Sequence, residues 1–229
     1  MTARPTTMPI LMAIGATLLS AGCATESART LEVPTVRASA AQPPAGPPVP
    51  LAVGRFDNRS NYAMGVFSDG VDRLGGQAKT TLVAHLQQSR RFEVLERENL
   101  AETGREAAFA GTPQRIRGAS FLVTGDITEF GRREVGDQQL FGLLGRGRQQ
   151  VAYAKVTLNV VDPVTSRVVW SARGAGEFAL STREVAGFGG TATYDATLNG
   201  KVLDLAVREA VDALVLARES GGWGPGARP

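Results

Sequence analysis

Residues 151–173 read VAYAKVTLNVVDPVTSRVVWSAR, and this stretch decides the fold class. Apolar residues alternate with other residues over 151–161 and again over 167–173, which is the period of two that half-buried strands show. Between the two runs, residues 162–166 contain the Asp-Pro pair and the serine that favour a turn. The stretch therefore predicts a β-hairpin.

Further strands and helices are predicted on both sides of this hairpin from the same kind of periodicity. Val71, Leu74, Ala78, Leu82 and Leu86 recur at helical spacing, and Ser68 or Asp69 is available to cap that helix. The order β-α-β-α-β-β-β-α predicts an α/β domain with a mixed sheet and about three helices. The other predicted strands are 50–56, 92–95 and 121–130, and the other predicted helices are 97–110 and 201–217.

The amino-terminal segment has the pattern of a lipoprotein signal. Cys23 is the only cysteine of the chain and ends the string Leu19-Ser20-Ala21-Gly22-Cys23, directly after an apolar run. Two or three acyl chains on such a cysteine give a stable membrane anchor. We predict a signal peptide at 1–22, a lipidated flexible tether rich in Ala, Pro, Ser and Thr at 23–48, and a folded domain at 49–229.

Two features of this segment leave a choice open. An ordinary secretory signal with a chance cysteine is the alternative to lipidation. Ala24 follows Cys23 where an aspartate would signal retention in the inner membrane, so the sequence indicates the outer membrane, with the protein facing the periplasm.

Composition and side-chain inventory argue against an enzyme. Removing Arg4 with the signal lowers the formal charge from +3 to +2, which does not indicate a nucleic-acid partner. A lipidated Cys23 leaves no thiol for a disulfide or a metal site. His85, the only histidine, lies inside a helical run and is read as a packed or surface residue. With no phosphate-binding loop and no nucleophile elbow, we predict no catalytic residue, no metal and no cofactor.

Two long stretches do not fit a compact domain, and loops of this length are usually functional. We predict amphipathic hairpins at 131–155 and 172–199. In the second, small, aromatic and aliphatic residues alternate with hydroxyls and charges, the pattern of a membrane barrel strand with lipid on one side. An ordinary hairpin packed on the domain shows the same pattern. The predicted lipid-facing residues are Phe178, Leu180, Ala192, Tyr194, Ala196 and Leu198.

Several strings, in order, cover nearly the whole mature chain and resemble the CsgG/HfaB family of curli-secretion lipoproteins. No single string is diagnostic, but their order and spacing match the family. They are Leu51-Ala52-Val53 to Asp57-Asn58, Ser89-Arg90-Arg91-Phe92, Leu95-Glu96-Arg97, Ala119 to Gly125, Phe141-Gly142, Val164-Thr165, Glu184-Val185 and Trp223 in the tail.

The resemblance implies a mechanism. Each subunit would be a periplasmic α/β domain on a lipid anchor, contributing two hairpins to the transmembrane β-barrel of a homo-oligomeric ring. That ring would pass curli-like fibre or adhesin subunits through the outer membrane, with periplasmic accessory proteins as further partners. The loop from Asn58 to Phe67 would line the constriction, with Tyr62, Met64 and Phe67 as its side chains.

The sequence departs from the family in two places. The aromatic and asparagine girdle of the curli channels is not carried over, because Gly65, Asp69 and Gly70 occupy the aligned positions, and the second hairpin is several residues shorter. A rival interpretation therefore keeps the tethered α/β domain as a periplasmic adaptor that binds another envelope protein without forming a pore, as LpoB-like activators of wall synthases do.

Overall fold

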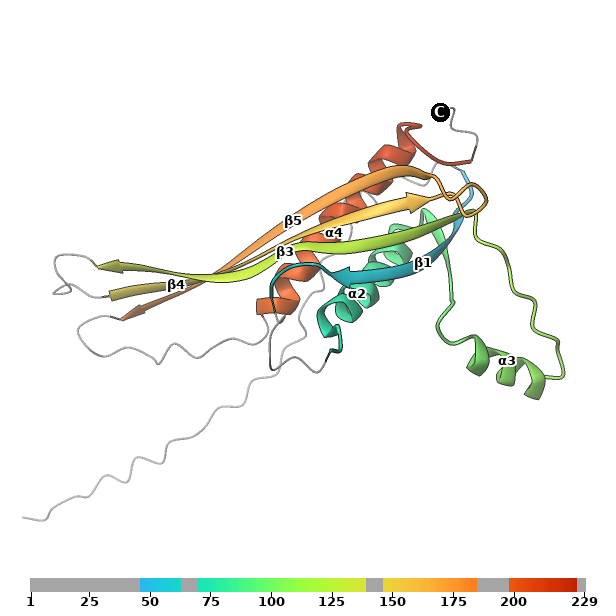
Figure 1. Cartoon of the computed structure of the whole chain (residues 1–229), viewed down its shortest axis with the longest axis horizontal. Helices are drawn as coiled ribbons and strands as arrows, with labels where there is room; N and C mark the ends of the chain where they lie inside the picture. The colour runs from blue at the N-terminus through green and yellow to red at the C-terminus, as the bar shows by residue number, and fades with distance from the viewer. Residues whose placement is uncertain (1–45, 63–69, 139–145, 185–197, 226–229) are drawn as a thin grey trace, which may run out of the picture. The chain divides into compact units, whose positions relative to one another are not determined.

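The computed structural model describes residues 46–62, 70–138, 146–184 and 198–225 of the chain (Figure 1). The order of elements there is the predicted β-α-β-α-β-β-β-α, so the α/β class with a mixed sheet and three helices is confirmed. No helix in the described ranges is long and apolar enough to cross a membrane. The elements are β1 (Val49–Asn58), α2 (Arg73–Ser89), β2 (Phe92–Leu95), α3 (Leu100–Phe109), β3 (Phe121–Gln138), β4 (Arg146–Val161), β5 (Val168–Glu184) and α4 (Leu198–Glu219).

The five strands form one sheet in the order β2-β1-β3-β4-β5. Strand β1 is parallel to both of its neighbours, β2 and β3, and the connections between these parallel strands contain α2 and α3. Strands β3, β4 and β5 are antiparallel in turn. The hairpin predicted from residues 151–173 is the β4–β5 pair, and its turn is closed by a hydrogen bond of 2.9 Å from the Asp162 N–H to the Arg167 carbonyl.

The core lies between the sheet and the helices α2 and α4 (Figure 1). On α2, Ala78, Leu82 and Leu86 are spaced four residues apart and are completely buried, as the helical periodicity predicted. Helix α4 packs on β4 and β5 and touches α2. The strands contribute alternate side chains to the same core, among them Leu51 of β1 and Leu158 of β4.

The start of α2 differs from the prediction. Asp72 is its N-cap, and its Oδ1 accepts a hydrogen bond of 2.7 Å from the Gly75 N–H. Val71, assigned to the helix from its spacing, precedes the cap and is 62% exposed. The predicted caps, Ser68 and Asp69, lie outside the described residues. Helix α3 falls inside the predicted range 97–110, and none of its residues is buried.

Helix α4 approaches β5 backbone to backbone at two glycines. A Cβ on Gly176 would lie 2.7 Å from the Val202 carbonyl oxygen, and a Cβ on Gly174 would overlap the carbonyl oxygen of Ala206. Gly176 shares one side of β5 with Phe178, for which the sequence predicted contact with lipid. In the structure α4 covers that side of β5.

The first predicted hairpin, residues 131–155, belongs to two long strands of the sheet. The β1–β3 ladder ends at the pair Asn58↔Ile127, whereas the β3–β4 ladder continues to Gln138↔Arg146. Strand β3 therefore runs 138 − 127 = 11 residues past its last pair with β1. Strand β5 follows β4 as far as Arg146↔Glu184, so three strands extend together (Figure 1).

The second predicted hairpin, residues 172–199, is described only at its two ends. Residues up to Glu184 belong to β5, and residues 185–197 lie outside the described part of the chain. Leu198 is the first residue of α4 and is completely buried. The expectation that Leu198 faces lipid is therefore wrong, because its side chain packs in the domain core.

Candidate functional site at the root of the extended strands

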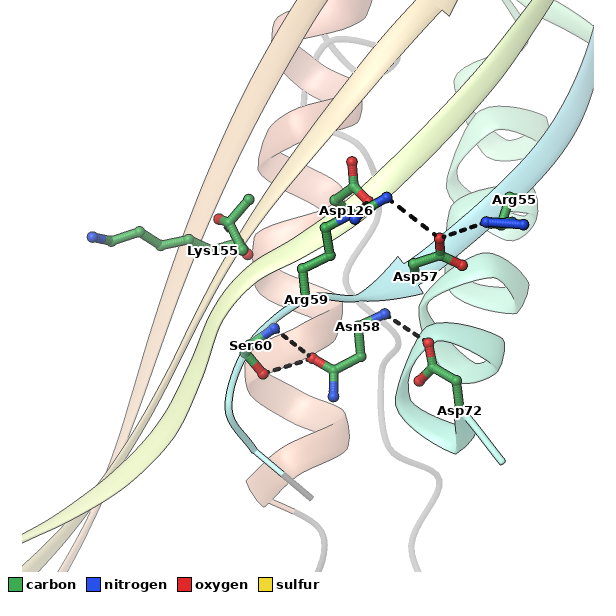
Figure 2. Close-up of polar contacts among 9 residues, drawn as sticks. Arg55, Asp57, Asn58, Arg59, Ser60, Asp72, Asp126 and Lys155 are labelled. Carbon is green, nitrogen blue, oxygen red and sulfur yellow. Dashed lines mark hydrogen bonds and ion pairs between the residues drawn. The ribbon is translucent and has the colours of Figure 1, made fainter. Parts of the chain in front are cut away.

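The loop after β1 is held at both ends by side chains. Asn58 forms a local turn, in which its Oδ1 accepts hydrogen bonds from the Ser60 N–H at 3.0 Å and the Ser60 hydroxyl at 2.6 Å. The Asn58 N–H donates to Asp72 Oδ2 at 2.6 Å, so the residue that ends β1 is bound to the residue that caps α2 (Figure 2). This hydrogen bond joins the end of β1 to the start of α2.

Charged side chains from β1, the loop and β3 meet beside this turn (Figure 2). Arg59 Nε donates to Asp126 Oδ1 at 2.6 Å, and this hydrogen bond raises the pKa of the Arg59 guanidinium above its ordinary value. Asp57 Oδ2 lies 3.7 Å from Arg59 and 3.4 Å from Arg55. Because these pairs are solvent-exposed, they contribute little to stability. They orient the loop more than they stabilise the fold.

Tyr62, a predicted constriction residue, is packed against the extended strands. Its ring centroid lies 4.6 Å from that of Phe130 on β3, and its hydroxyl accepts a hydrogen bond of 2.9 Å from Asn199 Nδ2 on α4. Asn199 Oδ1 in turn accepts one of 2.8 Å from Arg132 Nε. The other two predicted constriction residues, Met64 and Phe67, lie outside the described residues.

The predicted lipid-facing residues fall in three different situations. Phe178 is half-buried against the core, and the Lys201 ammonium lies 5.2 Å from its ring centroid, so it faces α4. Leu180 belongs to β5, but its side chain is outside the described part. Ala192, Tyr194 and Ala196 are also outside it, as is the predicted lipidation site Cys23.

The buried polar groups of the core are structural. His85 Nε2 lies 2.9 Å from Asp204 Oδ1 and joins α2 to α4, which places the only histidine as a packed helix residue. Arg91 is 1% exposed and donates from Nε to Glu219 Oε1 at 2.7 Å. In the described ranges no group of three or more metal-ligating side chains comes together.

Sequence reasoning missed the contacts of two residues, one in this region and one in the tail of the chain. The sequence prediction placed Asn199 at the end of a hairpin strand. Its position just before the predicted helix, where asparagine is a preferred cap, was the only signal that it could form side-chain hydrogen bonds. Trp223 was noted in the tail without a contact. It is buried, stacks on Phe92 with centroids 6.0 Å apart, and donates from Nε1 to the Leu214 carbonyl at 3.1 Å.

Comparison with known proteins gives a family match and a strong relative. Residues 34–221 match the family model described as curli production assembly/transport component CsgG. The sequence is 59% identical over 216 residues to the protein named "Putative lipoprotein NMB1126/NMB1164" of Neisseria meningitidis serogroup B, covering 94% of this chain and 96% of the relative. The family match includes every described strand and helix.

The chain also matches solved structures that are more distant in sequence. Lipoprotein GNA1162 of Neisseria meningitidis has a TM-score of 0.35 at 14% identity, covering 76% of this chain and 99% of that one. The PelC dodecamer of Paraburkholderia phytofirmans has a TM-score of 0.33 at 15% identity, covering 75% of this chain and 92% of that one.

Proposed function

The chain belongs to the CsgG family, and from that premise we propose that it is a non-enzymatic lipoprotein subunit of an oligomeric outer-membrane channel. The channel would secrete or anchor subunits of a curli-like fibre or adhesin. The observation that carries this proposal is the joint extension of β3, β4 and β5 beyond the body of the sheet.

The length of the extension supplies part of a membrane crossing. Strand β3 continues for eleven residues past its last pair with β1, and the first of these, up to Arg132, pack on Tyr62 and α4. Residues 133–138 extend past these contacts, which at about 3.3 Å per residue is roughly 20 Å of strand. A tilted transmembrane strand needs about 9 to 11 residues, so these residues would form part of such a strand.

The backbone groups on both edges of the extended strands would need further strands to pair with. Past Ile127, no described strand pairs with β3 on the side that β1 occupied, and β5 is an edge strand of the described sheet. Backbone groups on such edges cannot stay unpaired in lipid, where each unsatisfied group costs several kcal/mol. Closing a ring of identical subunits would pair the edges, which is why we propose the protein itself as the first partner.

The adaptor alternative is favoured by a different observation. Residues 128–138 read TEFGRREVGDQ, with Arg132 and Glu134 on one side of the alternation and Glu129, Arg133 and Asp137 on the other. A lipid-facing side should be an apolar band. An extension that is polar on both sides fits a periplasmic surface that binds another envelope protein.

The two functions predict different behaviour of the protein extracted in mild detergent. In the channel proposal, we expect a large oligomer that dissociates only on heating and that opens steady conductance levels in planar bilayers. Size-exclusion chromatography with light scattering and bilayer recordings would measure both properties. A monomer that opens no channel supports the adaptor.

The anchor is tested separately by Cys23→Ser. Without the acylated cysteine, we expect an uncleaved or soluble precursor that no longer fractionates with the outer membrane. Ala24→Ser, which keeps the cysteine, is the matched control and should fractionate as the natural protein does. If Cys23→Ser stays in the outer membrane unchanged, the anchor is not the lipid.

A further inference from the structure

We propose that Tyr62, Arg132 and Asn199 form a positioning junction, which fixes the loop after β1 and the start of α4 to the root of the extended strands. The three residues come from different parts of the chain and meet through two consecutive hydrogen bonds. The effect of the junction on the passage rests on the proposed channel, in which the loop 58–67 would line the passage. The hydrogen-bonded junction itself does not depend on the channel.

The contacts of the junction are directional and partly buried. Asn199 uses both ends of its amide, donating from Nδ2 to the Tyr62 hydroxyl at 2.9 Å and accepting from Arg132 Nε at 2.8 Å. Arg132 determines the amide orientation, since exchanging the oxygen and nitrogen would place the amide NH₂ against the Arg132 Nε–H donor, whereas the Tyr62 hydroxyl can either accept or donate. The Tyr62 ring is held independently by Phe130, at 4.6 Å and an interplanar angle of 57°.

The main chain of Tyr62 is held as well. Asn58 Nδ2 donates to the Tyr62 carbonyl at 2.9 Å, and Tyr62 is the last described residue before the segment 63–69. The ring, hydroxyl and carbonyl of Tyr62 are therefore all bound at the last described residue before the segment 63–69. A residue needed only for packing would not require three separate attachments of different kinds.

The position of the junction gives it a role. Phe130 and Arg132 lie on β3 just past Ile127, where the ladder with β1 ends and the extension begins. Asn199 is the second residue of α4, directly after residues 185–197. The junction thus joins the roots of the loop, of the extended strands and of the chain entering α4. Polar networks of this kind specify one arrangement among several that packing alone would allow.

In a ring, this arrangement would be repeated in every subunit. Loops that leave each subunit at one fixed position would give a passage of uniform width and a single conductance level. Loops freed from the junction would take different positions from subunit to subunit. Tyr62 and Asn199 are accordingly positioning residues, which act on the passage through the loop.

The test uses Tyr62→Phe, which keeps the ring and removes the hydroxyl, and Asn199→Ala, which removes both bonds. Tyr153→Phe is the matched control, because the Tyr153 hydroxyl makes no hydrogen bond within the described part of the chain. In planar bilayers we expect both junction variants to lose the single main level and to show several levels, with the heat-dissociation temperature of the oligomer unchanged. A single level retained by both variants would overturn the proposed role in the passage.

Hydrogen exchange tests the junction without a channel. In both variants, amides of residues 59–62 and of the first turn of α4 should exchange faster than in the Tyr153→Phe control, while core strand amides around Leu158 stay protected. Unchanged exchange at 59–62 and 198–202 would overturn the junction itself. If the natural protein opens no channel but these amides respond as expected, the channel proposal fails and the junction stands.

Discussion

Replacing Gly174 with valine should strongly destabilise the domain. At this position β5 and α4 meet backbone to backbone, because a Cβ would overlap the Ala206 carbonyl oxygen and lie 2.5 Å from the Ala210 amide nitrogen. A helix backbone cannot change rotamer to avoid the clash as a side chain can. Helix α4 would therefore have to move away from the sheet and expose its buried apolar face. We expect a loss of about 3 kcal/mol or more, at or above the usual range for overpacking.

A loss of that size is a large share of the roughly 5 to 15 kcal/mol that stabilises a typical domain. Urea unfolding followed by circular dichroism measures it directly. Ala175→Val is the matched control, since Ala175 is the next residue along β5 and its side chain is exposed. β-Branched residues suit such strand positions, so the control should be near neutral. Equal midpoints for the two variants would contradict the close packing of α4 on β5.

The alternation in the sequence predicted the strands but not what covers each side of them. Phe178 and Leu198 fit a pattern with an apolar side, and the pattern is the same whether lipid or a helix covers that side. In the structure, α4 covers Phe178, and Leu198 belongs to that helix. The order of the elements was therefore predictable, whereas the partner of each face depends on contacts distant in sequence.

The polar ends of the long strands were hard to assign for a related reason. Residues 131–150 lack a clean apolar alternation, so the sequence predicted a separate hairpin at 131–155 beside strands that end at 130 and begin at 151. Strands β3 and β4 nevertheless continue, because each satisfies the backbone groups of the other as far as Gln138↔Arg146. Backbone pairing carries no side-chain signature, and periodicity alone does not reveal it.

Sequence patterns could not predict the junction either. Tyr62 and Asn199 are 137 residues apart, and neither belongs to a motif that predicts the other. Tyr62 was singled out from the family resemblance as a constriction residue. The structure places its ring on Phe130 instead, so its effect on a passage would be exerted through the position of the loop.

Arginine at Ala192 or Ala196 should abolish detergent-resistant oligomers and export, whereas arginine at Thr193 should leave the oligomer intact. In the proposed barrel the alanines face lipid, where an arginine costs about 2 to 4 kcal/mol at mid-membrane. The threonine faces water, where the charge would change only ion selectivity. Because every subunit of a ring carries the substitution, even the lower cost accumulates and should block assembly.

The paired variants also decide between the two functions, because they differ only in the side of the strand that they modify. Gel electrophoresis with and without heating reports the oligomer, and bilayer recordings report the selectivity of Thr193→Arg. An adaptor has no lipid face, so Ala192→Arg and Thr193→Arg would then behave alike and the protein would remain monomeric. That result would leave the extended strands as a periplasmic binding surface, to which their polar sequence over 128–138 is suited.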